Sequence, residues 1–172
     1  MTMRLLRPAL VLLAVILVTP LAAAPPGGPS STFRVTGDVA QRTSFDLEML
    51  EALPVTKENV TYFAAGAVVT RSFTGTLLWD LLQSVGIVVD PTIKNDILRK
   101  VVIVTGSDGY QSVFGAGGIS PTFGGAQIMV AYAADAQPLG KDGFARIIAP
   151  GDKAGGRFVS NIVKIEVQDA GK

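Results

Sequence analysis

The sequence contains neither cysteine nor histidine among its 172 residues. Without cysteine, no disulfide can stabilise the fold, and no thiolate can act as a nucleophile or bind a soft metal. Without histidine, the chain lacks the commonest metal ligand among side chains and the commonest general base near neutral pH. The usual zinc sites and the thiol- and imidazole-dependent hydrolase mechanisms are therefore excluded.

The first 24 residues have the three parts of a secretion signal. Arg4 and Arg7 supply the positive end, an apolar run follows at residues 9–18, and small residues follow at 22–24. A run of about ten apolar residues suits a signal core and is shorter than the ~20 that span a membrane. We predict a Sec-type signal peptide at residues 1–24 and a periplasmic or secreted protein, with a retained membrane anchor as the alternative.

Export has consequences for cofactors and partners. A Sec-type substrate crosses the membrane unfolded, so it cannot carry a cofactor that was loaded in the cytoplasm. Loss of Arg4 and Arg7 with the signal changes the net charge from +1 to −1. A nearly neutral chain without basic clusters argues against nucleic acid or an anionic membrane as a partner.

The rest of the sequence predicts one α+β domain, a mixed β-sheet with short helices, over residues 33–172. A proline- and glycine-rich leader at residues 25–32 is expected to be disordered. Asp46 and Thr76 are expected to cap two short helices, at residues 47–53 and 77–84. β-branched and aromatic runs predict strands, which we expect at residues 33–39, 59–63, 67–73, 101–105, 110–114, 128–132, 144–149 and 162–167. The strand at 101–105 is expected to be buried on both faces.

Two glycine-rich segments, at residues 115–125 and 150–156, are predicted to be loops, and the first to border a site. Neither has the spacing of a phosphate-binding loop or a dinucleotide-binding turn. Gly109 predicts a sharp turn, at which Asp108 can bond to its own backbone and Tyr110 can present its ring. The alternative is a plain hairpin turn.

Three arginines stand close to aromatic residues or inside apolar sequence. Arg157 precedes Phe158 after the second glycine segment and close to Asp152, a combination that suits a planar polar ligand. The alternative is a solvated loop with Phe158 in the core. Arg71 lies two residues before Phe73. Arg146 lies in an apolar run and requires either a bound anion or a carboxylate, for which the candidates are Asp80, Asp108 and Asp152.

Several segments, taken in order, resemble the oxidoreductase molybdopterin-binding domain, which has the sulfite-oxidase-type fold. The segments that carry the resemblance are residues 45–54, 73–82, 101–110, 128–132, 137–140, 146–152 and 162–167. No single segment is specific for this fold, but the ordered set of segments is. Molybdenum enzymes of this fold hold the metal with a cysteine thiolate from a loop that corresponds to about Tyr62–Ala67, and this chain has no cysteine. We therefore expect no molybdenum.

The segment from Asp152 to Val159 is similar to a small periplasmic branch of this superfamily that lacks the cysteine. The resemblance implies a non-catalytic protein that binds a pterin and relays it to a membrane signalling partner. Phe73, Tyr110 or Phe158 would stack on the pterin ring. Arg71, Arg146 or Arg157 would face its carbonyl oxygen or a side-chain anion, and Asp108 or Asp152 would accept from its amino-pyrimidine edge. The alternatives are a molybdenum-cofactor oxidoreductase and a ligand-free interaction module.

Overall fold

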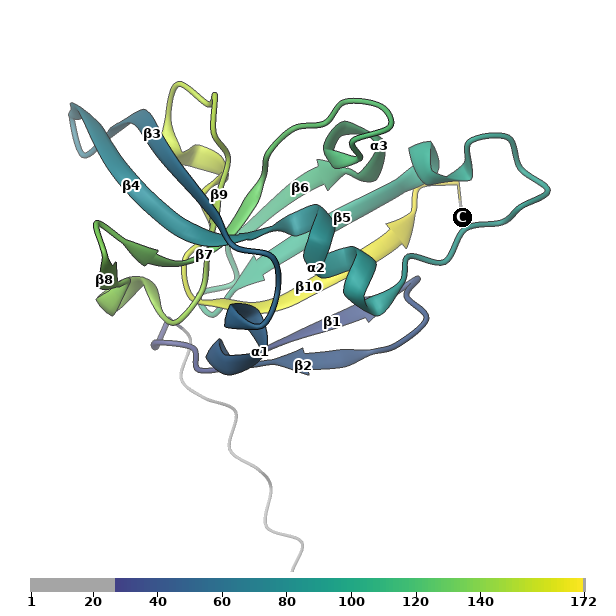
Figure 1. Ribbon diagram of the computed structural model, residues 1–172, viewed down its shortest axis with the longest axis horizontal. Coiled ribbons are helices and arrows are strands. Elements are labelled where there is room, and N and C mark those ends of the chain that lie inside the picture. The colour runs from purple at the N-terminus through teal and green to yellow at the C-terminus, as the bar shows by residue number, and fades with distance from the viewer. Residues whose placement is uncertain (1–26, 172) are drawn as a thin grey trace, which may run out of the picture.

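The computed structural model describes residues 27–171, which form two β-sheets with short helices around a shared apolar core (Figure 1). The predicted signal peptide at residues 1–24 lies outside the described residues. The mixed α+β architecture is confirmed.

The first sheet has the strand order β2-β1-β10-β5-β6. Its strands are β1 (Phe33–Gly37), β2 (Thr43–Phe45), β5 (Lys100–Gly106), β6 (Gln111–Gly115) and β10 (Ile162–Asp169). β1 pairs with β10 in parallel, and the other pairs are antiparallel. The first and last strands of the domain therefore lie side by side.

The second sheet has the order β3-β4-β7-β8, and β9 also pairs with β7. Its strands are β3 (Thr56–Ala64), β4 (Ala67–Leu77), β7 (Met129–Ala134), β8 (Gln137–Pro138) and β9 (Arg146–Ile148). β3 and β4 form a long hairpin that turns at Ala65 and Gly66, both at positive φ.

The helices are short. They are α1 (Leu47–Glu51), α2 (Leu78–Val85), α3 (Ala116–Ile119) and the 3-10 turns η1 (Asp96–Arg99), η2 (Gly140–Asp142) and η3 (Gly155–Arg157). Asp46 caps α1 as predicted, because its Oδ1 accepts from the Met49 N–H at 2.9 Å. α2 buries Leu78, Leu81 and Leu82 completely.

The predicted cap at Thr76 is wrong. Thr76 lies within β4, Leu77 occupies the N-cap position of α2, and no side chain caps this helix. The Leu78 N–H instead donates to the carbonyl of Ile128 at 2.8 Å, so a neighbouring segment of the chain replaces the cap. The Thr76 hydroxyl is buried without a hydrogen-bond partner among the described residues.

Three further expectations are corrected by the structure. Residues 27–30 are not a free leader, because the Gly27 N–H donates to the Ser107 carbonyl at 3.0 Å and the Ser107 hydroxyl donates to Gly28 at 2.7 Å. β5 is fully buried on one face only, since its residues alternate between buried and half-buried. The segment at residues 115–125 contains α3, so it is not entirely loop.

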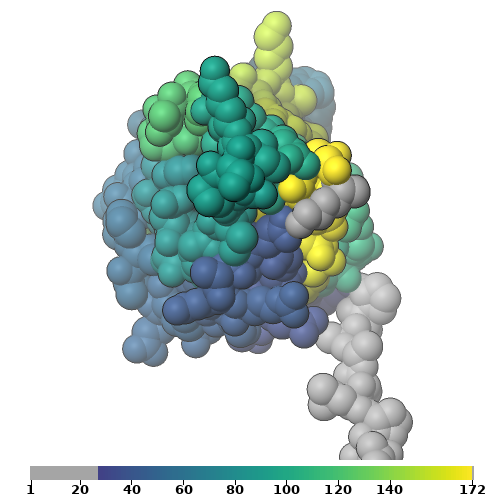
Figure 2. Space-filling model, turned by 90° about the vertical axis from the view of Figure 1, so that its right-hand side faces the viewer, coloured from purple at the N-terminus to yellow at the C-terminus, as the bar shows by residue number. Residues whose placement is uncertain are grey.

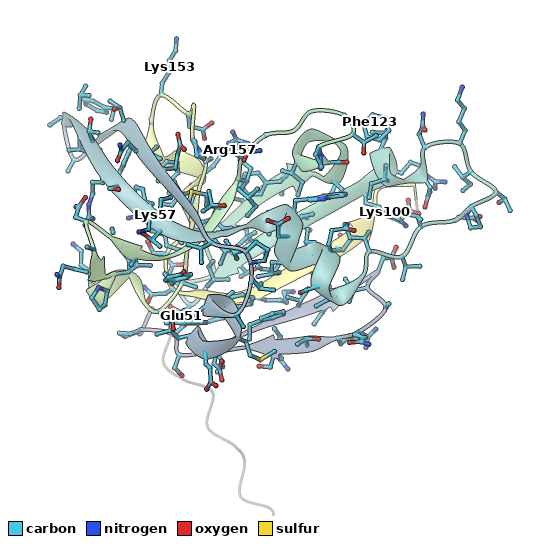
Figure 3. The ribbon with its side chains drawn as sticks, viewed as in Figure 1. Glu51, Lys57, Lys100, Phe123, Lys153 and Arg157 are labelled. Atoms are coloured by element: carbon cyan, nitrogen blue, oxygen red, sulfur yellow. The ribbon has the colours of Figure 1, made fainter. Side chains whose placement is uncertain are left out.

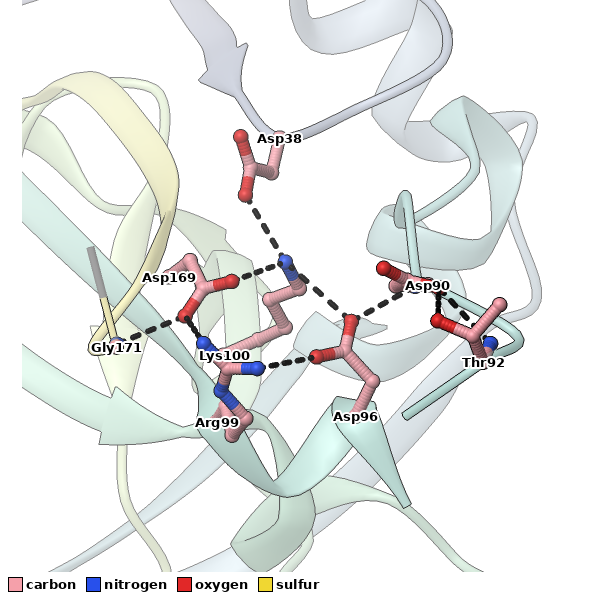
Figure 4. Close-up of polar contacts among 8 residues, drawn as sticks. All are labelled: Asp38, Asp90, Thr92, Asp96, Arg99, Lys100, Asp169 and Gly171. Carbon is pink, nitrogen blue, oxygen red and sulfur yellow. Dashed lines mark hydrogen bonds and ion pairs between the residues drawn. The ribbon is translucent and has the colours of Figure 1, made fainter. Parts of the chain in front are cut away.

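A buried charge cluster joins β5 to the ends of β1 and β10 (Figure 4). The Lys100 ammonium lies 3.0 Å from Asp38, 3.2 Å from Asp169 and 3.6 Å from Asp96. The Lys100 side chain is only 4% exposed. Arg99 adds ion pairs of 3.5 Å to Asp96 and 3.2 Å to Asp169. Two cations thus neutralise part of a dense group of carboxylates.

Figure 2 looks onto this end of the molecule, where the teal segment around residue 90 stands beside the yellow end of the chain. The loop before η1 is tied to the cluster, because the Asp90 N–H donates to Asp96 at 2.8 Å. The cluster therefore organises the loop as well as the strands.

Replacing Lys100 with methionine should destabilise the domain, because it leaves buried carboxylates without their counter-charge. Loss of one partner of a buried ion pair costs about 3–5 kcal/mol, and we expect a fall of this size in the free energy of unfolding. Urea denaturation followed by circular dichroism measures it. Lys94→Met, at an exposed lysine nearby, should change stability by less than about 0.5 kcal/mol. An equal effect of both variants would contradict this role.

The cluster also predicts stability loss at both extremes of pH. The Gly171 N–H, with help from Lys100 and against the effect of burial, holds the pKa of Asp169 below its usual value. The stability that Asp169 contributes is fully present above the unfolded pKa of about 3.9. It is lost as pH falls through the lower pKa of the folded state. Burial opposes the charge on Lys100, but the bonds to Asp38 and Asp169 prevail and raise its pKa. This contribution is present below about pH 10.4 and is lost as pH rises through the higher folded value.

Urea midpoints of the wild type should therefore fall below about pH 4 and above about pH 10. In Lys100→Met, the alkaline fall should be smaller. An unchanged alkaline slope in that variant would show that other groups cause it.

Candidate functional site

The segment at residues 150–158, here called the strap, crosses between the two sheets. The Phe63 N–H on β3 donates to the Lys153 carbonyl at 2.9 Å, and Phe63 forms a parallel bridge with Ala154. On the other side, the Tyr110 hydroxyl, just before β6, donates to the carbonyl of Gly156. The strap is thus bonded to an edge of each sheet, and the structure brings it together with the predicted turn at Asp108–Tyr110.

Arg157 is held in a defined position at the end of η3. Its Nε donates to Asp152 Oδ2 at 2.8 Å and its Nη2 to Oδ1 at 2.5 Å, which is a two-point fork. Its guanidinium carbon lies 5.1 Å from the centre of the Phe114 ring. The bond with Asp152 raises the pKa of Arg157. The side chain is still 48% exposed, so a ligand can reach it.

A hollow of about 160 Å³ opens beside Arg157. Its lining comes from β6, from α3 and the segment that follows it, and from both ends of the strap. It consists of Val113, Phe114, Gly115, Gly118, Ile119, Ala126, Ile128, Pro150 and Arg157. Arg157 is the one charged residue in this lining. The hollow therefore combines apolar side chains, glycine backbone and one guanidinium.

The glycine-rich segment that borders the hollow is ordered by its own backbone. The N–H groups of Gly124 and Ala126 donate to the carbonyls of Gly117 and Gly118, each at 2.9 Å. A Cβ on Gly124 would lie 2.5 Å from the Gly118 carbonyl oxygen, so only glycine allows this close approach. The expectation that this stretch borders a pocket fits the geometry.

Tyr110 and Asp108 remain accessible in the turn before β6. Gly109 has a φ of 84°, and Asp108 Oδ1 accepts from the Tyr110 N–H at 2.9 Å, as the sequence predicts. Tyr110 is 50% exposed. Its hydroxyl is engaged with the strap, so its ring is the part that a ligand can contact.

Phe73 and Phe158, both predicted to stack on a ligand, lie inside the protein. Phe73 is completely buried and Phe158 is 5% exposed. Tyr62 packs between them, with ring centres 6.4 Å from Phe73 and 4.8 Å from Phe158. Neither phenylalanine has an open ring face in this structure. Of the residues predicted to stack, Tyr110 alone is exposed.

Arg146 and Arg71 have structural partners of their own. Arg146 pairs with Asp142 at 2.9 Å, not with Asp80, Asp108 or Asp152, and its guanidinium lies over Phe158 at 5.8 Å. Its Nε is buried without a hydrogen-bond partner in the described part of the chain. Arg71 pairs with Asp135 at 2.8 Å at the β7–β8 turn and lies 5.8 Å from the Phe73 ring.

The structure therefore assembles one part of the predicted site and separates the other. Asp152, Arg157 and Tyr110 meet at the strap, Asp108 shares the turn with Tyr110, and Phe158 and Arg146 lie in contact with each other. Arg71 and Phe73 belong to the second sheet. Phe114 is not among the residues predicted from the sequence. Its strand buries Ser112 and Phe114 and exposes Val113, so the hydropathy pattern does not indicate that Phe114 faces inward.

The donor set decides which part of a molybdenum–pterin cofactor the chain fits. The segment Tyr62–Ala67, where a thiolate would be expected, forms the end of the β3–β4 hairpin and carries no sulfur. Within residues 27–171, no group of three or more acidic, histidine or cysteine side chains could hold a metal ion. The residues do not fit molybdenum. Arg157 offers hydrogen-bond donors and Tyr110 an exposed ring, which are the kinds of group that the edge and face of a pterin require.

No helix among residues 27–171 is long and apolar enough to cross a membrane.

The comparisons with known proteins agree with this architecture. Among solved structures, the sulfane dehydrogenase SoxCD from Paracoccus pantotrophus is similar, with a TM-score of 0.66 and 20% sequence identity. The likeness covers 80% of this chain and 38% of the matched chain, so this chain spans well under half of that chain's length. At this identity it shows the fold alone. No curated protein matches the sequence.

The profile of one protein family, the oxidoreductase molybdopterin binding domain, matches residues 24–172. This range contains both sheets and every residue of the candidate site. The chain belongs to the oxidoreductase molybdopterin-binding domain family.

Proposed function

We propose that this protein is a non-catalytic pterin-binding protein that acts in the periplasm and relays pterin to a membrane signalling partner. One observation carries the proposal. A domain of a molybdopterin-binding family, in a chain without any thiol, has a single arginine beside a hollow with no other charged side chain. The chain keeps features that suit the organic part of the cofactor and has no thiolate for the metal.

The dimensions of the hollow support a small, flat ligand. Pockets for drug-sized molecules measure about 300–1,000 Å³, and this hollow is smaller at about 160 Å³. It suits insertion of part of a bicyclic ring, with the remainder exposed near Tyr110. Arg157 would donate to the ring carbonyl.

The acceptor for the amino-pyrimidine edge would be Asp108. Both oxygens of Asp152 already accept from Arg157. Asp108 is exposed and uses Oδ1 for its own turn. A carboxylate can accept at both oxygens, so Asp108 keeps capacity for a ligand N–H.

The non-catalytic assignment follows from the residue types. With no cysteine and no histidine, the chain offers neither the thiolate that the molybdenum enzymes use nor an imidazole for proton transfer. The periplasmic location rests on the signal-like pattern at residues 1–24. The signalling partner is proposed from the resemblance to the small branch without cysteine.

Titration of the purified domain with oxidised and tetrahydro-pterins tests the proposal. We expect micromolar binding by calorimetry, which corresponds to about −8 kcal/mol. Arg157→Ala should weaken binding about 10- to 150-fold, the effect of losing a charge-assisted hydrogen bond of about 1.5–3 kcal/mol. Arg42→Ala, at an exposed arginine outside the hollow, is the matched control and should bind normally.

Two outcomes would overturn the proposal. The absence of binding to every pterin would favour an interaction module that has lost its ligand. Stoichiometric molybdenum in protein purified from its native compartment would favour an oxidoreductase.

A further inference from the structure

We propose that Asp152 makes this site selective for pterins without a charged substituent, so that a phosphate-bearing pterin binds more weakly than its neutral parent. The inference rests on the proposed function and specifies the ligand class. It starts from the fork between Arg157 and Asp152, in which both carboxylate oxygens accept from one guanidinium.

The fork occupies one of the two edges of the Arg157 guanidinium that can bind an anion at two points, and it compensates the positive charge. A guanidinium has five N–H donors in a fixed plane, and two-point binding of phosphate or carboxylate uses two parallel donors. Asp152 occupies Nε and Nη2 in this way. Three donors remain, which can serve a carbonyl oxygen. The positive charge that a phosphate needs is already compensated.

Arg157 is also restrained from turning towards an anion. Its guanidinium lies over the Phe114 ring at 5.1 Å, and the residue before it is bonded through its carbonyl to the Tyr110 hydroxyl. A phosphate could bind only at the outer Nη donors, where Asp152 already compensates the charge of Arg157 and its carboxylate would repel the phosphate. A neutral carbonyl is not repelled in this way.

The other cations near the strap do not supply a free positive charge at the hollow. Arg146 is paired with Asp142. Lys153 is exposed at the tip of the strap and points outward, away from Arg157 (Figure 3). No other charged side chain lines the hollow. The site thus offers hydrogen-bond donors without net positive charge.

The test compares 6-hydroxymethylpterin with its monophosphate ester by calorimetry. In the wild type, the ester should bind about tenfold more weakly, the equivalent of roughly one charge-assisted hydrogen bond. In Asp152→Asn, which keeps the shape but frees the charge of Arg157, the preference should disappear or reverse. The ester's affinity for this variant should fall as salt is added, because exposed charges are screened.

Matched variants separate selectivity from folding. Asp152→Glu keeps the charge and should keep the wild-type preference. Asp135→Asn removes a carboxylate from the Arg71 pair on the second sheet and should leave the preference unchanged. Thermal unfolding of each variant shows whether it is folded under the conditions of binding.

Each result has one meaning. The proposed selectivity is wrong if the wild type binds the ester more tightly than its neutral parent. It is also wrong if Asp152→Asn weakens the affinity for both ligands equally. Neither outcome contradicts pterin binding itself. Failure of both ligands to bind the folded wild type overturns the proposed function itself.

Discussion

The candidate site depends on the attachment of one strap to both sheets. Phe63 bonds the strap from β3 of the second sheet, and Tyr110 bonds it from the turn before β6 of the first. A glycine-rich segment has many accessible conformations, and fixing each residue costs about 1–2 kcal/mol of backbone entropy. Two anchors from different sheets restrict this freedom. These two anchors therefore hold Arg157 beside the hollow.

The β3–β4 hairpin shows how a ligand-bearing segment can take on a structural role. The resemblance drawn from the sequence matches its end to the segment that supplies a thiolate in molybdenum enzymes of this fold. Here Ala65 and Gly66 close a tight turn, and the backbone of Phe63 meets the strap instead. Below the turn, Gly75 marks a shift in the pairing of β4 with β7, and a Cβ there would lie 2.3 Å from the Val130 carbonyl oxygen. Glycine is therefore required at this irregularity.

The sequence predicted most strands and the cap at Asp46, because these depend on residues close together in the chain. It failed where a distant segment decides the outcome. Thr76 has the chemistry of a cap, but pairing with β7 holds it in a strand. Arg71 finds Asp135, 64 residues away, and nothing local indicates that pairing. Arg146 finds Asp142 only four residues away, because the 3-10 turn η2 precedes β9. The site was predicted by residue type, whereas its grouping at the strap required the tertiary structure.

The cluster around Lys100 and the fork of Arg157 with Asp152 have different roles, because they differ in burial. Lys100 is 4% exposed among carboxylates, so its ion pairs lie where removal of one partner leaves an expensive buried charge. The fork of Arg157 with Asp152 is half exposed on the arginine side, and exposed ion pairs contribute only about 0–1 kcal/mol. The fork, half exposed on its arginine side, should therefore stabilise the fold less than the buried cluster around Lys100 does. Its main effect is to fix the orientation and the net charge of the one cation that borders the hollow, which is a property of the site.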